Sequence, residues 1–263
     1  MKISIASYAF HGLLAEGKMD VFGYLESCKY RYRVDAADIW NGMLPSTEPD
    51  FLRKVRQAMD EKEMGLANLC VDGAHLWDPD PAERERLYQN ALAHLRAAVI
   101  LGARTVRLDV GVRADDISDE AFDYIVQRYR EYADFAADHG FLVGPETHWG
   151  ASLFLENQRR LHAAVDHPAY GLLLHIGHWN AGDEATNDAA VAGWTMHTHV
   201  DARITRTGLE ARMAILRDAG YQGYWGVEHH SGTNEYAEVA WQISEVARVV
   251  KRWELERAAA ASK

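Results

Sequence analysis

The feature of this sequence that most constrains its fold is a repeated unit, in which a short apolar run is followed by a helical pattern. Eight such units follow one another at a mean spacing of about 33 residues, which is the length that a strand, a helix and their connections need. Strands that alternate with helices form parallel sheets, and eight units are the number that closes a (β/α)₈ barrel. We therefore predict an α/β fold of this kind.

The predicted elements fill the chain without a linker-like stretch of proline, glycine and serine. The apolar runs predict strands at residues 2–8, 34–40, 65–72, 103–111, 141–148, 172–177, 194–201 and 224–230. The helical patterns cover residues 18–32, 49–63, 81–101, 118–140, 152–165, 184–191, 208–220 and 234–256. We expect a single (β/α)₈ TIM barrel domain over residues 1–257, followed by a disordered C-terminal tail at residues 258–263.

Polar side chains end the last four predicted strands in matching phase. Alternate residues of a strand share a face, so Glu146, His175, His199 and Glu228 all face the same way at the ends of strands five to eight. The steps between them are 29, 24 and 29 residues, about one strand-helix unit each. The carboxyl ends of barrel strands meet at one mouth. The four side chains are therefore predicted to converge there.

Two carboxylates and two imidazoles form a suitable ligand set for a divalent cation. This mixture favours Mn²⁺, Co²⁺, Fe²⁺ or Zn²⁺ over Mg²⁺. Two carboxylates buried side by side without a cation would raise a pKa sharply. We predict a metal site at these four residues, with Mn²⁺ as the first candidate. The alternative is that they are solvated or ion-paired residues of the barrel rim that bind no metal.

Other residues gather at the same predicted mouth. Asp109 and Arg107 share the inner face of the fourth strand, where they either bind a polar substrate or form an internal ion pair. Trp40 ends the second strand, and either packs in the core or offers its aromatic face to a sugar ring. Four histidines are candidates for substrate contact, for support of the ligands or for ordinary structural roles: His148, His178, His197 and His230.

Charge and composition exclude several other classes of function. The net charge is −11 and no basic patch compensates it, so nucleic acid is not expected as the principal partner. The two cysteines show neither metal nor disulfide spacing, which is typical of a reducing compartment. We find no signal peptide and no apolar run of the ~20 residues that a membrane helix needs. The expectation is a cytoplasmic protein without a membrane partner.

Four segments resemble those of a known family: Pro145-Glu-Thr-His148, Gly177-His-Trp-Asn180, His197-Thr-His-Val-Asp201 and Gly226-Val-Glu228. They resemble the xylose isomerase-like TIM-barrel superfamily, which includes sugar isomerases, ketose 3-epimerases such as D-tagatose 3-epimerase, inosose and 3-dehydroshikimate dehydratases, and endonuclease IV. The resemblance covers nearly the whole chain. It implies the metal ligands named above, with His178 in the place of a substrate-contacting histidine. Where the family usually has Asp on strand six, this chain has His175, which removes one negative charge.

The resemblance implies a divalent-metal-dependent sugar isomerase or epimerase. Glu146 and Glu228 would move a proton next to a carbonyl, through a metal-stabilised enediolate. Three alternatives stay open: a lyase, dehydratase or C-glycoside-cleaving enzyme that acts on a keto-sugar at the same site, a nuclease with several zinc ions, and a non-catalytic sugar-binding or partner subunit. The expected ligand is a small sugar or keto-polyol. Superfamily members often form dimers or tetramers, so a homo-oligomer is a further expectation.

Overall fold

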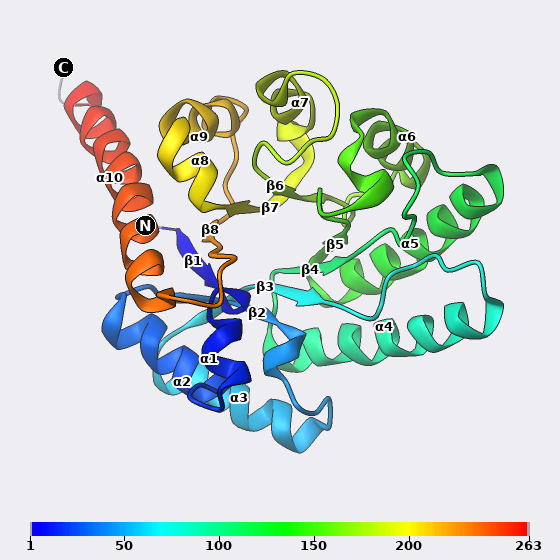
Figure 1. Cartoon of the computed structure of the whole chain (residues 1–263), viewed down its shortest axis with the longest axis horizontal. Coiled ribbons are helices and arrows are strands. Elements are labelled where there is room, and N and C mark those ends of the chain that lie inside the picture. Colours follow the sequence, from blue (N-terminus) through cyan, green and yellow to red (C-terminus); the bar gives the residue numbers. More distant parts are fainter. Residues whose placement is uncertain (1, 262–263) are drawn as a thin grey trace.

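The computed structural model describes residues 2–261 as a barrel of eight parallel strands with helices outside it (Figure 1). The strands are hydrogen-bonded in the order β5-β4-β3-β2-β1-β8-β7-β6. This confirms the predicted single-domain TIM barrel. Each strand lies within its predicted range: β1 (Ile3–Ala6), β2 (Ala36–Trp40), β3 (Gly65–Val71), β4 (Thr105–Leu108), β5 (Leu142–Gly144), β6 (Leu172–His175), β7 (Thr195–Val200) and β8 (Trp225–Val227).

Strands β5 and β6 close the barrel through a shorter set of backbone contacts than the other neighbours. Isolated bridges join Val143 to Tyr170 and Glu146 to Leu173, and the Leu173 amide donates to the Pro145 carbonyl at 2.9 Å. The backbones of the two segments approach so closely that a Cβ at Gly144 would lie 1.7 Å from the Gly171 carbonyl oxygen. Glycine is therefore required at this position. The closure places the end of β5 beside the end of β6.

The helices alternate with the strands, and their ends follow the expected capping signals. In the helix of residues 81–101 the Asp80 side chain accepts from the Ala82 amide, and Gly102 ends the helix at a φ of 70°. Ser118 caps the following helix in the same way. The helices are α1 (His11–Ala15), α2 (Val21–Glu26), α3 (Pro49–Glu61), α4 (Pro81–Leu101), α5 (Asp119–His139), α6 (Leu155–Val165), α7 (Glu184–Val191), α8 (Ala202–Thr207), α9 (Leu209–Asp218) and α10 (Glu235–Ala261).

Some boundaries differ from the predicted ones. The helix expected over residues 18–32 begins at Val21 and continues beyond α2 as a wider turn, η2 (Ser27–Arg31). Helices α1 and α8 were not predicted, because both are too short to show a periodic pattern. The tail predicted to begin at residue 258 continues α10 as far as Ala261. Residues 262–263 of that prediction lie outside the described residues.

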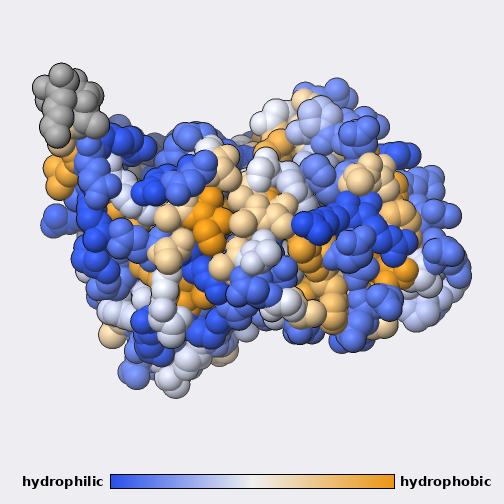
Figure 2. Space-filling view, turned by 90° about the horizontal axis from the view of Figure 1, so that it is seen from above, coloured by the Kyte–Doolittle hydropathy of each residue, from blue (hydrophilic) through white to orange (hydrophobic). Residues whose placement is uncertain are grey.

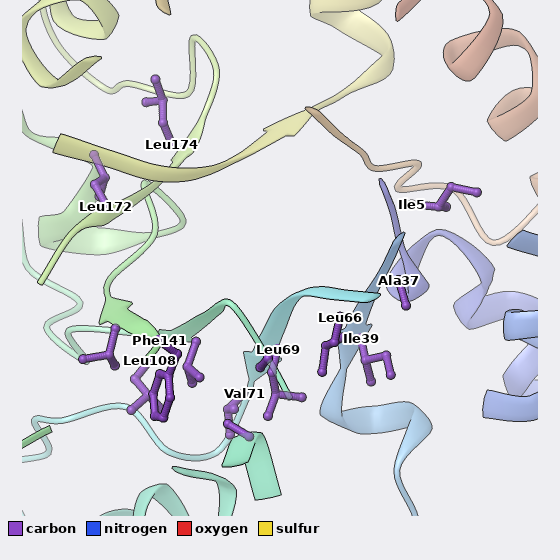
Figure 3. Packing of buried hydrophobic residues seen from close by; sticks show 14 of the residues in the cluster. Ile5, Ala37, Ile39, Leu66, Leu69, Val71, Leu108, Phe141, Leu172 and Leu174 are labelled. Carbon is purple, nitrogen blue, oxygen red and sulfur yellow. The ribbon is translucent and has the colours of Figure 1, made fainter. Parts of the chain in front are cut away.

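Most of the core lies between the barrel and its helices. Strand side chains on the face opposite to the predicted inward residues belong to this layer, among them Val106, Leu108, Leu172, Leu174 and Val227. In Figure 3 the labelled side chains point away from the barrel interior, on opposite sides of the barrel. Because this packing fixes which face of each strand points outward, it also determines which side chains point inward.

A second, smaller apolar cluster fills the barrel interior, and it corrects one prediction. The cluster consists of Cys70, Leu173 and Met196. Strict alternation along β7 predicts that Met196 faces outward. The register between β6 and β7 shifts at Leu172, and such an irregularity changes the phase of the strand, so that Met196 lies inside.

The surface is mostly hydrophilic on the side where α6, α7, α9 and α10 lie, with hydrophobic residues in separate patches (Figure 2). Among residues 2–261, no helix combines the length and apolarity that a membrane crossing requires.

Candidate active site

The four residues predicted to converge lie together at the carboxyl end of the barrel. His199 Nδ1 is 3.1 Å from Glu146 Oε1 and 3.3 Å from Glu228 Oε2. His175 Nδ1 is 3.3 Å from the same Glu146 oxygen and 3.4 Å from the same Glu228 oxygen. All four side chains are buried, and their ligand atoms lie within 4.8 Å of one another. We call this group the four-residue cluster.

Strand register brings the four residues to one level. His175 ends β6 and pairs with His199 of β7, which in turn pairs with Gly226 of β8. Glu146 follows β5 and forms a bridge with β6, and the Glu228 amide donates to the Val200 carbonyl at 3.0 Å. Neighbouring parallel strands that end at the same level place their last inward side chains around one point.

Charge pairing keeps the cluster ionised. Burial disfavours both carboxylates, but the nearby imidazoles, led by His199, outweigh it and hold the pKa of Glu146 and of Glu228 well below its usual range. Burial also disfavours the charged form of His175, but Asp201 and the two glutamates raise its pKa to about 9. A divalent cation that displaced the imidazole protons would meet two anionic oxygens and two nitrogens. The residues present therefore fit the predicted metal.

Asp38 holds His199 from the side opposite to the cluster. Asp38 Oδ2 accepts from His199 Nε2 at 3.0 Å and from His197 Nε2 at 2.7 Å. Its other oxygen, Oδ1, accepts from the side-chain Nδ2 of Asn68 at 2.9 Å. Asp38 thus holds a proton on Nε2, so that a cation which displaces the proton on Nδ1 would meet a lone pair of His199 directed at the cluster, an arrangement typical of metal-binding histidines.

Of the roles left open for His197, its position favours support of the ligands or a structural role over substrate contact. Its side chain is only 1% exposed and does not line the cavity above the cluster. The phase assignment was correct, but His197 lies two residues earlier on β7 than His199, and so one layer deeper in the barrel. The sequence contained a signal for Asp38 in its phase with Trp40 on β2, but its partner lies 159 residues away.

A cavity of about 360 Å³ opens above the cluster, and five of the candidates for substrate contact line it: His148, His178, His230, Arg107 and Trp40. Tyr8 also lines this cavity. The Tyr8 ring meets the Trp40 ring edge-on at 5.2 Å. Tyr8 was not among the predicted site residues, although the first predicted strand ends there; β1 itself ends at Ala6, and Tyr8 lies in the turn η1 (Ser7–Phe10).

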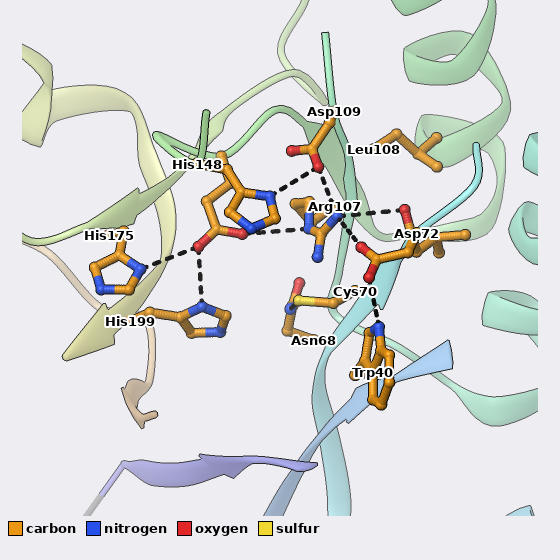
Figure 4. A network of polar contacts seen from close by, with 12 residues as sticks. Trp40, Asn68, Cys70, Asp72, Arg107, Leu108, Asp109, His148, His175 and His199 are labelled. Atoms are coloured by element: carbon orange, nitrogen blue, oxygen red, sulfur yellow. Dashed lines mark hydrogen bonds and ion pairs between the residues drawn. The ribbon is translucent and has the colours of Figure 1, made fainter. Parts of the chain in front are cut away.

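Arg107 and Asp109 form the internal ion pair that was one of the two predicted alternatives (Figure 4). Arg107 Nη1 lies 2.8 Å from both Asp109 Oδ2 and Asp72 Oδ1, and its Nε lies 3.3 Å from Glu146 Oε2. Arg107 still lines the cavity, whereas Asp109 does not. Asp109 acts on the cavity through its neighbours, since it also accepts from His148 Nδ1 at 2.9 Å.

Two of the histidines that line the cavity, His148 and His178, differ in protonation. Burial disfavours charge on His148, but Asp109 and Glu146 raise its pKa to about 9. Burial and the neighbouring His175 lower the pKa of His178. The Nδ1 atom of His178 is buried and has no hydrogen-bond partner among residues 2–261. The wall thus offers one cationic and one neutral imidazole at neutral pH.

We expect metal binding to tighten as the pH rises. The pKa of His175 is about 9, so this side chain carries a proton at neutral pH, whereas a metal ligand has to be a neutral imidazole. Between about pH 6.5 and about pH 8 the affinity should increase by up to about tenfold per pH unit for each proton displaced. Calorimetric titration of chelator-treated protein with Mn²⁺, in buffers of different ionisation enthalpy, measures both the affinity and the protons released. An affinity that does not change over this range would contradict the expectation.

Comparison with known proteins agrees with this architecture. A family model described as a xylose isomerase-like TIM barrel matches residues 31–249. Three similar solved structures are the 3-keto-D-glucoside 4-epimerase YcjR from E. coli (TM-score 0.77, 15% identity, 94% of this chain and 99% of that chain), the probable 3-DHS dehydratase AsbF from Bacillus anthracis (0.72, 15%, 94% and 99%), and the IOLI protein with a bound zinc atom (0.75, 16%, 95% and 96%). No curated protein sequence matches the chain significantly. Identities this low show a shared fold alone.

Proposed function

The chain belongs to the xylose isomerase-like TIM barrel family, and from this premise we propose that it is a divalent-metal-dependent sugar isomerase or epimerase. The observation that carries the proposal is the four-residue cluster, in which two glutamates and two histidines converge beneath a cavity. The fold relatives with known or assigned activities include a sugar epimerase and a probable dehydratase, which supports a sugar-modifying enzyme.

The cavity has the character of a sugar site. Tyr8 and Trp40 supply aromatic surface for the apolar side of a sugar ring. Asp72, His148 and Arg107 supply charged hydrogen-bonding groups for its hydroxyls and carbonyl. A few polar groups that converge on an otherwise aromatic pocket are typical of small-molecule sites.

Glu146, His175, His199 and Glu228 are the proposed metal ligands. A bound divalent cation would polarise the carbonyl of the sugar and stabilise the negative charge that develops when a neighbouring C–H loses its proton. His175 stands where the family usually has an aspartate, yet its Nδ1 lies within the cluster like that of His199. This geometry supports a complete ligand set in spite of the substitution.

The two glutamates are the groups proposed to move the proton. Both are ionised at neutral pH, so either can accept a proton from carbon. They approach from β5 and β8, with β6 and β7 between them, and Glu228 Oε1 accepts no hydrogen bond from residues 2–261. If one glutamate removes the proton and the other takes up a proton from solvent and delivers it to the opposite face, the configuration of the carbon is inverted. Return by the same glutamate to the adjacent carbon gives isomerisation.

A lyase is the second candidate, and the pair of cavity histidines His148 and His178 is the observation that favours it. After the same proton removal, a substituent on the next carbon can leave if its oxygen receives a proton. His148 is protonated at neutral pH and lines the cavity, so it can supply this proton, while the neutral imidazole of His178 contacts the substrate beside it. One of the fold relatives is a probable dehydratase, and C-glycoside cleavage would begin with the same proton removal but deliver the second proton to the departing carbon.

The proposal predicts deuterium exchange at a carbon next to a carbonyl. Purified protein with Mn²⁺ is incubated in D₂O with a panel of ketohexoses, inososes and keto-glycosides, and the products are read by NMR. An isomeric product that carries deuterium supports the proposed function, and chelator should abolish its formation. An unsaturated product identifies the lyase instead. If the metal binds but no sugar exchanges or changes, the protein is a non-catalytic binding or partner subunit, and the proposed function is wrong.

A further inference from the structure

A second cavity adjoins the candidate active site. Its volume is about 280 Å³, and we call it the side groove, lined by Val71, Asp72, Gly73, His75, Asp109, Arg113, His148 and Trp149. It shares Asp72 and His148 with the cavity above the four-residue cluster. These two side chains are 48% and 39% exposed, so they form an open rim between the two spaces. A ligand that fills both spaces would be nearly twice the size of one that fills the first.

Trp149 gives the side groove an aromatic wall with polar groups around it. The ring of Trp149 is half-buried, and its Nε1 donates to Asp109 Oδ2 at 3.3 Å. His75 meets it edge-on at 5.9 Å, and the Arg113 guanidinium lies 5.3 Å from the ring centroid. Aromatic surface beside fixed donors and acceptors is the combination that a sugar or aromatic ring requires.

Asp109 lines the side groove, and one of its carboxylate oxygens has no hydrogen-bond partner among residues 2–261. Its Oδ2 accepts from Arg107, His148 and Trp149, so this oxygen is the buried Oδ1. An unpaired buried carboxylate oxygen is costly, so a donor is expected there. Arg107, a permanent cation, already pairs with this carboxylate at 2.8 Å. A neutral hydroxyl therefore suits the position better than a further cation.

The walls of the side groove are held by backbone contacts. The Leu76 amide donates to the Asp109 carbonyl at 2.9 Å, and the Ala151 amide donates to the Val112 carbonyl at 3.0 Å. Gly150 has a φ of 57°, and a Cβ there would lie 2.1 Å from the Val112 carbonyl oxygen. The groove is thus formed before any ligand binds, which lowers the entropic cost of binding.

We propose that the substrate is a glycoside rather than a free monosaccharide, with the reacting keto-sugar above the four-residue cluster and its second ring in the side groove against Trp149. This inference rests on the proposed function, and it adds the substrate class and a second binding site. The hydroxyl of the second ring would donate to Asp109 Oδ1.

The test compares matched ligands at equilibrium, independently of turnover. Each keto-sugar of the panel is offered to the Mn²⁺-loaded protein as the O-methyl and the O-glucosyl derivative, and both dissociation constants are measured by calorimetry. We expect the glucosyl derivative of at least one keto-sugar to bind about tenfold or more tightly, because stacking and one hydrogen bond add to its affinity. Trp149→Ala should remove this advantage, and Trp149→Phe should keep part of it.

Trp241→Ala is the matched control, because Trp241 also lies beneath an arginine, Arg206, but belongs to α10 and lines neither cavity. It should leave the ratio of the two dissociation constants unchanged. Equal affinity for the methyl and glucosyl derivatives, or a glucosyl advantage that survives in Trp149→Ala, overturns the inference about the side groove. In that case, turnover of either derivative would still support the proposed function. If no sugar of the panel binds, both are wrong. A preserved glucosyl advantage without any turnover contradicts only the proposed function.

Discussion

Replacing Glu146 or Glu228 by glutamine is expected to reduce turnover by about 10²- to 10⁴-fold, the contribution that general acid-base catalysis usually makes. Glutamine has nearly the shape of glutamate, but its amide does not accept a proton from carbon at neutral pH. The Glu146 and Glu228 side chains are 3% and 11% exposed, so solvent cannot easily take over the role of a missing base. The rate of deuterium exchange and the rate of product formation, both followed by NMR, measure the effect.

The same substitutions also remove one negative charge from the proposed metal site, so metal content has to be measured beside the rate. Each variant is therefore assayed at saturating Mn²⁺, with its bound metal determined by elemental analysis and its fold checked by circular dichroism. Glu131→Gln provides a control, because Glu131 accepts from Tyr88 on the outside of the barrel and lines neither cavity. Wild-type turnover by a fully loaded Glu146→Gln or Glu228→Gln protein would exclude that residue as the essential base.

The positions of the four cluster residues followed from strand phase because two regularities hold in this barrel. Inward and outward side chains alternate along each strand, and the outward set packs against the helices, which fixes the orientation. Parallel register then brings His175 and His199 opposite each other. Their convergence could be predicted from the sequence, whereas their role as metal ligands stays a prediction.

The errors arose where one of these regularities fails. The irregularity between β6 and β7 changes the phase at Met196, so alternation assigned it to the wrong face. Tyr8 enters the cavity from a turn, where no period constrains the direction of a side chain. The depth of His197 depends on how far each strand extends relative to its neighbours, which the sequence does not state.

Contacts that depend on barrel closure were the hardest to predict. Asp38 meets His197 and His199 across the interior, from the other half of the chain. The side groove likewise combines segments from β3, β4 and β5 that are separated by whole helices. Each residue of these sets is an ordinary strand-end residue by itself, and only the folded register shows which of them meet.

Replacing Asp38 is expected to weaken Mn²⁺ binding by about 10- to 100-fold, the usual effect of losing a partner that orients a metal-binding histidine. Asp38 Oδ2 accepts from the Nε2 atoms of both His199 and His197, and burial gives neither imidazole a solvent partner in its place. In Asp38→Ala the His199 ring is free to rotate or to place its proton on Nδ1, and the Nδ1 lone pair is then lost to the metal. Two unsatisfied buried donors should also lower the free energy of unfolding by about 1–3 kcal/mol each.

Comparison with a second variant separates orientation of His199 from general damage to the core. Asn68→Ala removes the hydrogen bond to the other carboxylate oxygen of Asp38 and leaves both imidazole contacts in place. Asn68→Ala should therefore destabilise the chelator-treated protein in thermal unfolding while its Mn²⁺ dissociation constant stays close to that of the wild type. Asp38→Asn should weaken Mn²⁺ binding, because its amide offers a donor as well as an acceptor to two imidazole N–H groups. Equal Mn²⁺ affinity in Asp38→Asn, Asp38→Ala and the wild type would show that Asp38 supports the barrel core but does not position His199.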